Sequence, residues 1–138
     1  MLSSFKFHHI GIAVKEIEAT SALYVNAGYK KSEDFLDSFQ NVKICWLEKE
    51  GMPRCELLAP VDEKSPVVKT LEKNGVTPYH TCYEVEKIEE AIAELRKQRY
   101  VLVSASHEAP GMMPFGGGKV AFLFHKDAGL IELVEICK

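Results

Sequence analysis

The sequence has little of what marks nucleic-acid-binding, membrane or secreted proteins. Its formal net charge is −3, and it has no stripe of Lys and Arg, which argues against a nucleic-acid partner. No apolar run approaches the roughly 20 residues of a membrane span, so we expect no membrane partner. Residues 1–6 lack the apolar core of a secretory signal, which predicts a cytoplasmic protein.

Paired cysteine motifs are also missing. The four cysteines do not have the spacing of a metal finger, and each lies in an expected strand or near the C-terminus. We therefore expect buried, reduced thiols, with a structural disulfide as the alternative interpretation.

A duplication is the strongest positive signal in the chain. At an offset of 71 positions His9 matches His80, and the strand after each histidine is followed by a helical pattern beginning at Ile17 or Ile88. Such a match predicts two copies of one module, each with a histidine in its first strand.

The two copies have the same expected order of a strand, a helix and three strands. We expect one domain over residues 1–138, with module one at about 6–60, a linker at 61–77 and module two at about 78–137. The fold class is therefore α+β, with two tandem βαβββ modules forming a curved mixed sheet around a metal site. The expected elements are strands at 6–14, 29–33, 42–47, 54–58, 79–85, 100–103, 119–125 and 130–136, and helices at 16–27, 67–73 and 87–98.

Some local expectations are more specific. The segment 34–41 is expected to be a polar connection, and the loop 104–118 is expected to include a mobile flap, at 107–118, that covers a ligand. Three histidines without a repeat partner are expected at the surface. They are His8, His107 and His125. The helix 16–27 should bury Ile17, Ala22, Leu23 and either Val25 or Tyr24.

Two glutamates complete a candidate metal site. Glu56 and Glu132 each stand near the start of the last strand of a module, so each can meet the histidine of the same module, His9 or His80. Two imidazoles and two carboxylates suit Zn, Ni, Co, Fe or Mn. A lone strand histidine is more often an ordinary core or surface residue, but the repeat of both residue types favours a metal.

The motifs resemble those of the vicinal oxygen chelate superfamily, which includes glyoxalase I, methylmalonyl-CoA epimerase, extradiol dioxygenases and bleomycin- or fosfomycin-resistance proteins. The resemblance covers essentially the whole chain, and small clostridial-type glyoxalase I proteins look most similar. It implies His9, Glu56, His80 and Glu132 as metal ligands, and a homodimer. The motifs that carry it are residues 8–14, Glu56 to Pro60, 79–85, 119–123 and 129–133.

The resemblance implies a metal-dependent isomerase or lyase that acts through an enediolate or enolate intermediate. The expected cofactor is one divalent ion of Ni, Zn or Co, with Glu132 as the base and Glu56 opposite it. The preferred interpretation is a glyoxalase I-like lyase (lactoylglutathione lyase type). Its substrate would be a hemithioacetal or an acyl-thioester. Lys119 and Phe122 are the expected substrate-binding residues.

Two alternatives stay open. The Glu56-to-Pro60 motif resembles a methylmalonyl-CoA epimerase more than a glutathione enzyme. Ala13 and Pro60 stand where glyoxalase I usually has an arginine and an asparagine, which argues against glutathione. Epimerases, however, have a second glutamate base just ahead of the strand 42–47, where residues 38–41 offer none and Asp37 is shifted. The other alternative is a resistance-type protein that binds a small molecule without catalysis. Metal analysis distinguishes it, because such a protein retains no stoichiometric metal.

Overall fold

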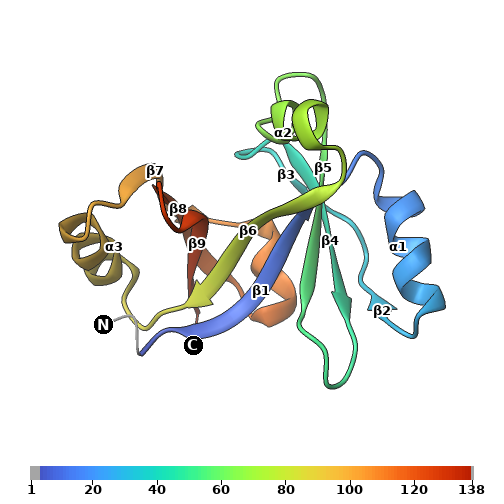
Figure 1. The fold of residues 1–138 in the computed structure, drawn as a ribbon. Helices are drawn as coiled ribbons and strands as arrows, with labels where there is room; N and C mark the ends of the chain where they lie inside the picture. The colour runs from blue at the N-terminus through green and yellow to red at the C-terminus, as the bar shows by residue number, and fades with distance from the viewer. Residues whose placement is uncertain (1–3, 138) are drawn as a thin grey trace. The chain divides into compact units, whose positions relative to one another are not determined.

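The computed structural model describes residues 4–137, which divide into two compact units. We call residues 9–79 the N-terminal unit, and residues 80–137 together with 4–8 the C-terminal unit. Strand β1 (Lys6–Ala13) begins in the C-terminal unit and continues into the N-terminal unit, and β6 (Thr77–Glu84) crosses the boundary in the opposite sense. Figure 1 labels both strands.

The N-terminal unit has a mixed sheet in the strand order β2-β4-β5-β1. Strands β1 and β5 are parallel, β4 is antiparallel to β5, and β3 pairs with β4. Figure 1 shows α1 beside β2 and β4. Besides β1, the elements are α1 (Ile17–Asn26), β2 (Lys30–Lys31), β3 (Phe35–Asp37), β4 (Val42–Glu48), β5 (Cys55–Pro60) and α2 (Val67–Asn74).

Strand β3 corrects the expectation of a polar connection at 34–41. Phe35 pairs with Ile44, and Asp37 pairs with Val42. The short polar run 38–41 is thus only the turn between two antiparallel strands. The sequence signal was weak because three residues of strand leave little periodicity to detect.

Helix α1 buries a different face from the one expected. Ile17 and Ser21 are buried, and Tyr24 packs at the edge of the same core, whereas Leu23 is 70% exposed. Val25 and Ala22 are also exposed. The inner positions follow the helical spacing that starts at Ile17, and Leu23 lies well round the helix from that direction. The helix ends as expected before Gly28, which has a φ of +96°.

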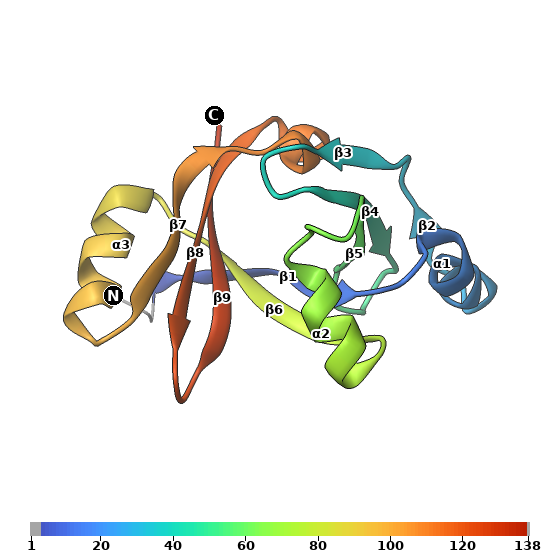
Figure 2. The same cartoon turned by 90° about the horizontal axis from the view of Figure 1, so that it is seen from above.

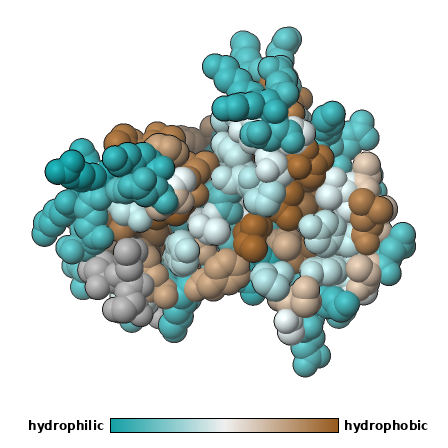
Figure 3. Space-filling view, viewed as in Figure 1, coloured by the Kyte–Doolittle hydropathy of each residue, from teal (hydrophilic) through white to brown (hydrophobic). Residues whose placement is uncertain are grey.

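One face of this sheet packs against α1, which leaves the other face for polar groups. The core beneath α1 contains Val14, Cys45, Leu47, Leu57 and Ala59. Helix α2 contributes Val67 and Leu71 to the buried interior. At the position of α2, the surface in Figure 3 is hydrophilic, as expected for an amphipathic helix whose apolar residues face inward.

The C-terminal unit repeats the design with the strand order β6-β9-β8-β7. Strands β6 and β9 are parallel, and β8 is antiparallel to both β9 and β7. Figure 2 shows α3 beside β7. Its core includes Ile88, Leu95, Leu123 and Leu133. Its elements besides β6 are α3 (Ile88–Lys97), β7 (Val101–Glu108), the 3₁₀ helix Pro110–Phe115, β8 (Gly118–His125) and β9 (Gly129–Ile136).

The segment 104–118 is more ordered than expected. Strand β7 continues to Glu108, and a 3₁₀ helix occupies Pro110–Phe115. Within it Met112 is buried and Met113 is exposed, so this segment contributes to the core of its own unit. His8 is likewise buried rather than at the surface, and its ring stands edge-on to Phe115 at 4.7 Å between ring centroids.

The predicted fold class is confirmed: the fold is α+β, built from two strand–helix–strands modules with mixed sheets. The four cysteines are all free thiols, as expected, and Cys45, Cys55 and Cys82 are buried. Cys137 is exposed, so the expectation of a buried thiol is wrong there. Within residues 4–137 the structure has no helix with the length and apolar character needed to cross a membrane.

Candidate metal centre

A buried histidine–glutamate pair lies on the face of the N-terminal sheet that α1 does not cover. Gly11 of β1 pairs with Glu56 of β5. Side chains alternate along a strand, so His9, two residues before Gly11, points to the same face as Glu56. The His9 Nε2 and Glu56 Oε1 atoms are 3.2 Å apart, and both side chains are almost fully buried.

The C-terminal unit has a second pair with the same construction. Cys82 of β6 pairs with Glu132 of β9, and His80 lies two residues before Cys82. The His80 Nε2 and Glu132 Oε1 atoms are 3.1 Å apart, again with almost no exposure. The two pairs therefore agree in strand register, burial and, within 0.1 Å, donor distance.

An aromatic ring supports each histidine. Trp46 of β4 pairs with Glu56, and its ring meets His9 edge-on, with 4.8 Å between ring centroids and an interplanar angle of 82°. Phe122 of β8 pairs with Glu132 and meets His80 at 5.3 Å and 85°. Each ring restricts the rotation of its imidazole and so helps to fix the direction of the histidine Nε2.

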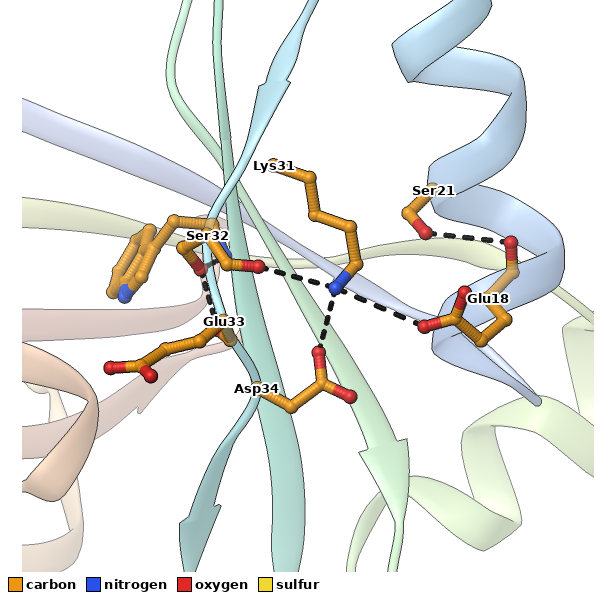
Figure 4. A network of polar contacts seen from close by, with 7 residues as sticks. Glu18, Ser21, Lys31, Ser32, Glu33 and Asp34 are labelled. Carbon is orange, nitrogen blue, oxygen red and sulfur yellow. Dashed lines mark hydrogen bonds and ion pairs between the residues drawn. The ribbon is translucent and has the colours of Figure 1, made fainter.

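Ser32 fixes the backbone of Trp46. The Ser32 N–H donates to the Trp46 carbonyl at 2.9 Å, and the Trp46 N–H donates to Ser32 Oγ at 2.8 Å. The neighbouring Lys31 Nζ lies 2.9 Å from Asp34 Oδ1 and 3.9 Å from Glu18 Oε1 of α1. Figure 4 shows this network, in which Lys31 of β2 connects to Asp34 and to Glu18 of α1.

The geometry of each pair is compatible with shared coordination of a metal. Two donor atoms about 2.1 Å from one ion, at roughly tetrahedral or smaller angles, are themselves about 3.1–3.4 Å apart. The measured nitrogen–oxygen distances are 3.2 and 3.1 Å. A buried carboxylate is costly without a positive partner, and a protonated imidazole or a metal ion can each supply that charge.

The two expected substrate-binding residues lie on opposite faces of β8. Phe122 is buried on the face of Glu132, in contact with His80. Lys119 is exposed and pairs with Glu135. Three positions separate it from Phe122, so its side chain points to the other face of the strand. The structure thus brings Phe122, but not Lys119, to the His80–Glu132 pair.

The sequence reasoning did not identify Trp46 and Phe122 as a repeated feature. Each aromatic residue lies ten positions before the glutamate of its own module. That spacing follows from the antiparallel register of the last two strands, in which both aromatic residues lie directly opposite a glutamate. A comparison of the modules aligned on Glu56 and Glu132, rather than on the histidines, would have revealed it.

The fold and the paired His–Glu arrangement define a class of protein. Residues 8–122 match the family model described as Glyoxalase/Bleomycin resistance protein/Dioxygenase superfamily. The chain belongs to this superfamily, which confirms the resemblance drawn from the sequence motifs.

Its relatives within the superfamily are more specific. The chain is 33% identical over 134 residues to the mitochondrial methylmalonyl-CoA epimerase of Homo sapiens, covering 94% of this chain and 73% of that protein. It is 31% identical over 137 residues to the ethylmalonyl-CoA/methylmalonyl-CoA epimerase of Cereibacter sphaeroides, covering 95% and 98% of the two chains. A crystallised variant of Streptomyces coelicolor methylmalonyl-CoA epimerase, in complex with 2-nitronate-propionyl-CoA, has a TM-score of 0.81 at 26% identity, with 96% and 98% coverage.

These relatives change the order of the two enzyme predictions. The preferred interpretation, a glyoxalase I-like lyase acting on a hemithioacetal, has no support among them. The alternative, an epimerase of the methylmalonyl-CoA type, is the one that they favour. Ala13 and Pro60, which stand where glyoxalase I usually has an arginine and an asparagine, were the sequence signals that pointed the same way.

Proposed function

We propose that this chain is an epimerase of a 2-alkylmalonyl-CoA thioester, with methylmalonyl-CoA as the first substrate to test. The observation that supports it most directly is the likeness to the human and Cereibacter epimerases over almost the whole chain. The buried His–Glu pair in each unit supplies the residue types that the chemistry needs.

The proposed metal ligands are His9 and Glu56 from one unit and His80 and Glu132 from the other. Neutral imidazole nitrogens and carboxylate oxygens fit a divalent ion such as Zn, Ni or Co. When bound, the ion supplies positive charge that stabilises negative charge developing on substrate oxygens. The edge-on contacts from Trp46 and Phe122 hold the imidazoles in position.

The reaction itself is a proton transfer at the carbon between the thioester and the carboxylate. A carboxylate of the enzyme removes this proton, and the electron pair moves into the thioester carbonyl. We assign this role to Glu132, as the family resemblance implies, with Glu56 opposite. Burial suits the role, because a carboxylate out of water is a stronger base towards carbon acids.

The experiment is an epimerisation assay on one stereoisomer of methylmalonyl-CoA in deuterium oxide. The enzyme should interconvert the isomers and introduce deuterium at the α-carbon. Glu132→Gln should reduce the rate by about 100-fold or more, while the exposed Glu108→Gln serves as the matched control with unchanged rate. Absence of isomer conversion, with any divalent metal, contradicts the proposal.

Parallel assays separate the remaining alternatives. Formation of a thioester from a methylglyoxal–glutathione hemithioacetal would instead identify a glyoxalase I-like lyase. Purified protein without stoichiometric metal and without turnover would identify a binding protein. The homodimer implied by the resemblance stays a prediction, which sedimentation velocity tests.

A further inference from the structure

Three apolar side chains extend the sheet face of the C-terminal unit that carries Glu132. Figure 2 shows the strands β7, β8 and β9 of this unit side by side. Phe124 lies two residues after Phe122 on β8, and Leu130 lies two residues before Glu132 on β9. Phe122 and Glu132 are directly paired, and side chains alternate along a strand, so all four point to one face. Val101 of β7 pairs with Phe124 and therefore shares that face, and we call Val101, Phe124 and Leu130 the apolar ledge.

The apolar ledge is open to solvent. Val101 is 63% exposed, Phe124 is 44% exposed, and Leu130 is half-buried. Phe124 pairs with both of the others, and directly paired side chains have Cβ atoms about 4.5–5.5 Å apart. The three side chains therefore form one continuous patch. A single exposed apolar residue is ordinary, but a patch beside buried polar residues is typical of a ligand-binding surface.

The duplication provides a comparison for this surface. In the N-terminal unit Glu48 lies two residues after Trp46, and Arg54 lies two residues before Glu56. Lys30 pairs with Glu48. These three charged residues occupy the positions equivalent to the apolar ledge, and the Arg54 Nε and Glu48 Oε1 atoms are 3.1 Å apart. The module therefore accepts charged side chains at these positions, so its folding does not require an apolar ledge.

The apolar ledge begins close to the expected position of the reacting carbon. Leu130 and Glu132 are separated by about 7 Å, the length of two residues of strand, and Glu132 is the residue proposed to remove the α-proton. In an acyl-CoA the thioester sulfur is two bonds from that carbon. The pantetheine arm, a chain of methylene and amide groups without charge, follows the sulfur. An arm that leaves towards the β8–β9 turn passes over the apolar ledge after a few bonds.

We infer that the apolar ledge binds the pantetheine arm of the acyl-CoA substrate and so favours CoA thioesters over shorter thioesters. The inference rests on the proposed epimerase function. An uncharged arm matches an uncharged surface, whereas the charged residues at the equivalent positions of the other unit would have to lose water to accept it. Contact with the arm is the same before and during proton transfer, so it should lower KM and leave kcat unchanged.

The principal variant is Phe124→Glu, which copies Glu48 of the other module. In epimerisation of methylmalonyl-CoA with added divalent metal, its KM should be higher than that of wild type by about 10-fold or more. Its kcat should stay within about twofold of wild type. The control Leu23→Glu introduces the same charge at a 70% exposed apolar position of α1, where the other module has Glu94. This control should keep both constants.

Shortened substrates separate the arm from the acyl group and from the nucleotide. Methylmalonyl-pantetheine keeps the arm without the nucleotide, and its KM should rise as much in Phe124→Glu as that of the CoA thioester. The S-ethyl thioester of methylmalonate ends two carbons after the sulfur, and its kcat/KM should change by no more than about twofold. An equal loss with all three substrates overturns the inference, because it places the effect at the acyl group or in the fold. A loss with the CoA thioester alone, or with none of them, also overturns it.

A second variant keeps the test decisive if Phe124→Glu folds poorly. Val101→Ser changes a more exposed side chain and should raise KM for methylmalonyl-CoA about threefold, with the S-ethyl thioester again unaffected. If the apolar ledge is instead a contact between two copies of this chain, sedimentation velocity will show dissociation of Phe124→Glu while KM is unchanged, which overturns the inference. A wild-type protein that epimerises none of the three substrates contradicts the proposed function itself, and the inference fails with it.

Discussion

Exchanging His9 for asparagine tests whether a single metal ion uses both His–Glu pairs. The proposed centre has four ligands, two from each unit, so His9→Asn and His80→Asn should each weaken the same ion. Asparagine removes the imidazole nitrogen but keeps a small polar side chain in the buried position. The control is His125→Asn, since His125 accepts the Asp127 N–H at 3.0 Å and lies outside both pairs.

The size of the effect follows from linkage between metal binding and folding. A metal at about 100 times its Kd stabilises the folded state by about 2.7 kcal/mol. For a domain of this length about 1 kcal/mol changes Tm by roughly 3–4 °C, so metal-stripped wild type should gain about 8–10 °C. Loss of one ligand that weakens binding by about 100-fold leaves the metal near its Kd, where the gain falls to roughly 1–2 °C.

Differential scanning fluorimetry measures the Tm values, and equilibrium dialysis with elemental analysis measures the metal per chain. We expect one ion per chain in wild type, lost from both histidine variants and retained by His125→Asn. Two ions per chain, each lost only when the histidine of its own unit is changed, would refute the shared centre. No change in Tm for stripped wild type with Ni, Zn or Co would also refute it.

Two further predictions concern the rest of the molecule. Burial raises the pKa of Cys45 to about 12, so at pH 8 iodoacetamide should label the exposed Cys137 far faster than Cys45 in the native protein; equal rates by mass spectrometry would contradict the buried position. Burial opposes the charged form of Lys31, but the Asp34 hydrogen bond and nearby carboxylates outweigh it and raise the pKa of Lys31 above 10.5. A group whose pKa is higher in the folded state stabilises the fold fully at pH values below its unfolded-state pKa. This stabilisation is lost as the pH rises through its folded-state pKa. Lys31→Met should therefore lower the free energy of unfolding, measured in urea at pH 7, by roughly 1 kcal/mol or less. The difference between wild type and the variant should shrink above about pH 10.5. A difference that stays constant with pH would show that packing of the side chain, and not its charge, is responsible.

The duplication allowed much of the fold and the His–Glu pairs to be predicted from sequence. His9 and His80 occupy equivalent positions in β1 and β6, and Glu56 and Glu132 occupy equivalent positions in β5 and β9. Side-chain alternation then predicts that each His–Glu pair lies on one face of its sheet. The strand register then confirms the placement within each unit. Periodicity was informative here because both strands of each pair are long.

The wrong predictions concern residues whose burial is determined by tertiary packing and not by the local sequence. Leu23 and Tyr24 are both apolar and adjacent in sequence, and only the direction of Ile17 against the sheet determines that Tyr24 turns inward. His8 and His9 are identical side chains on opposite faces of β1. Sequence reasoning assigned one to the surface, but the 3₁₀ helix that carries Phe115 covers it. The burial of Asp37 was equally invisible, because a polar turn gives no sign of what packs over it.

The candidate metal centre depends on the register of strand β5. Glu56 is flanked by Cys55 and Leu57, which belong to the hydrophobic core beneath α1. Deleting one residue within β5 would therefore turn a leucine or cysteine side chain towards His9 and turn the Glu56 carboxylate into that core. An insertion or deletion in the turn at 49–54 would leave this alternation intact, whereas a one-residue shift of β5 would remove a candidate ligand and disturb the hydrophobic core together.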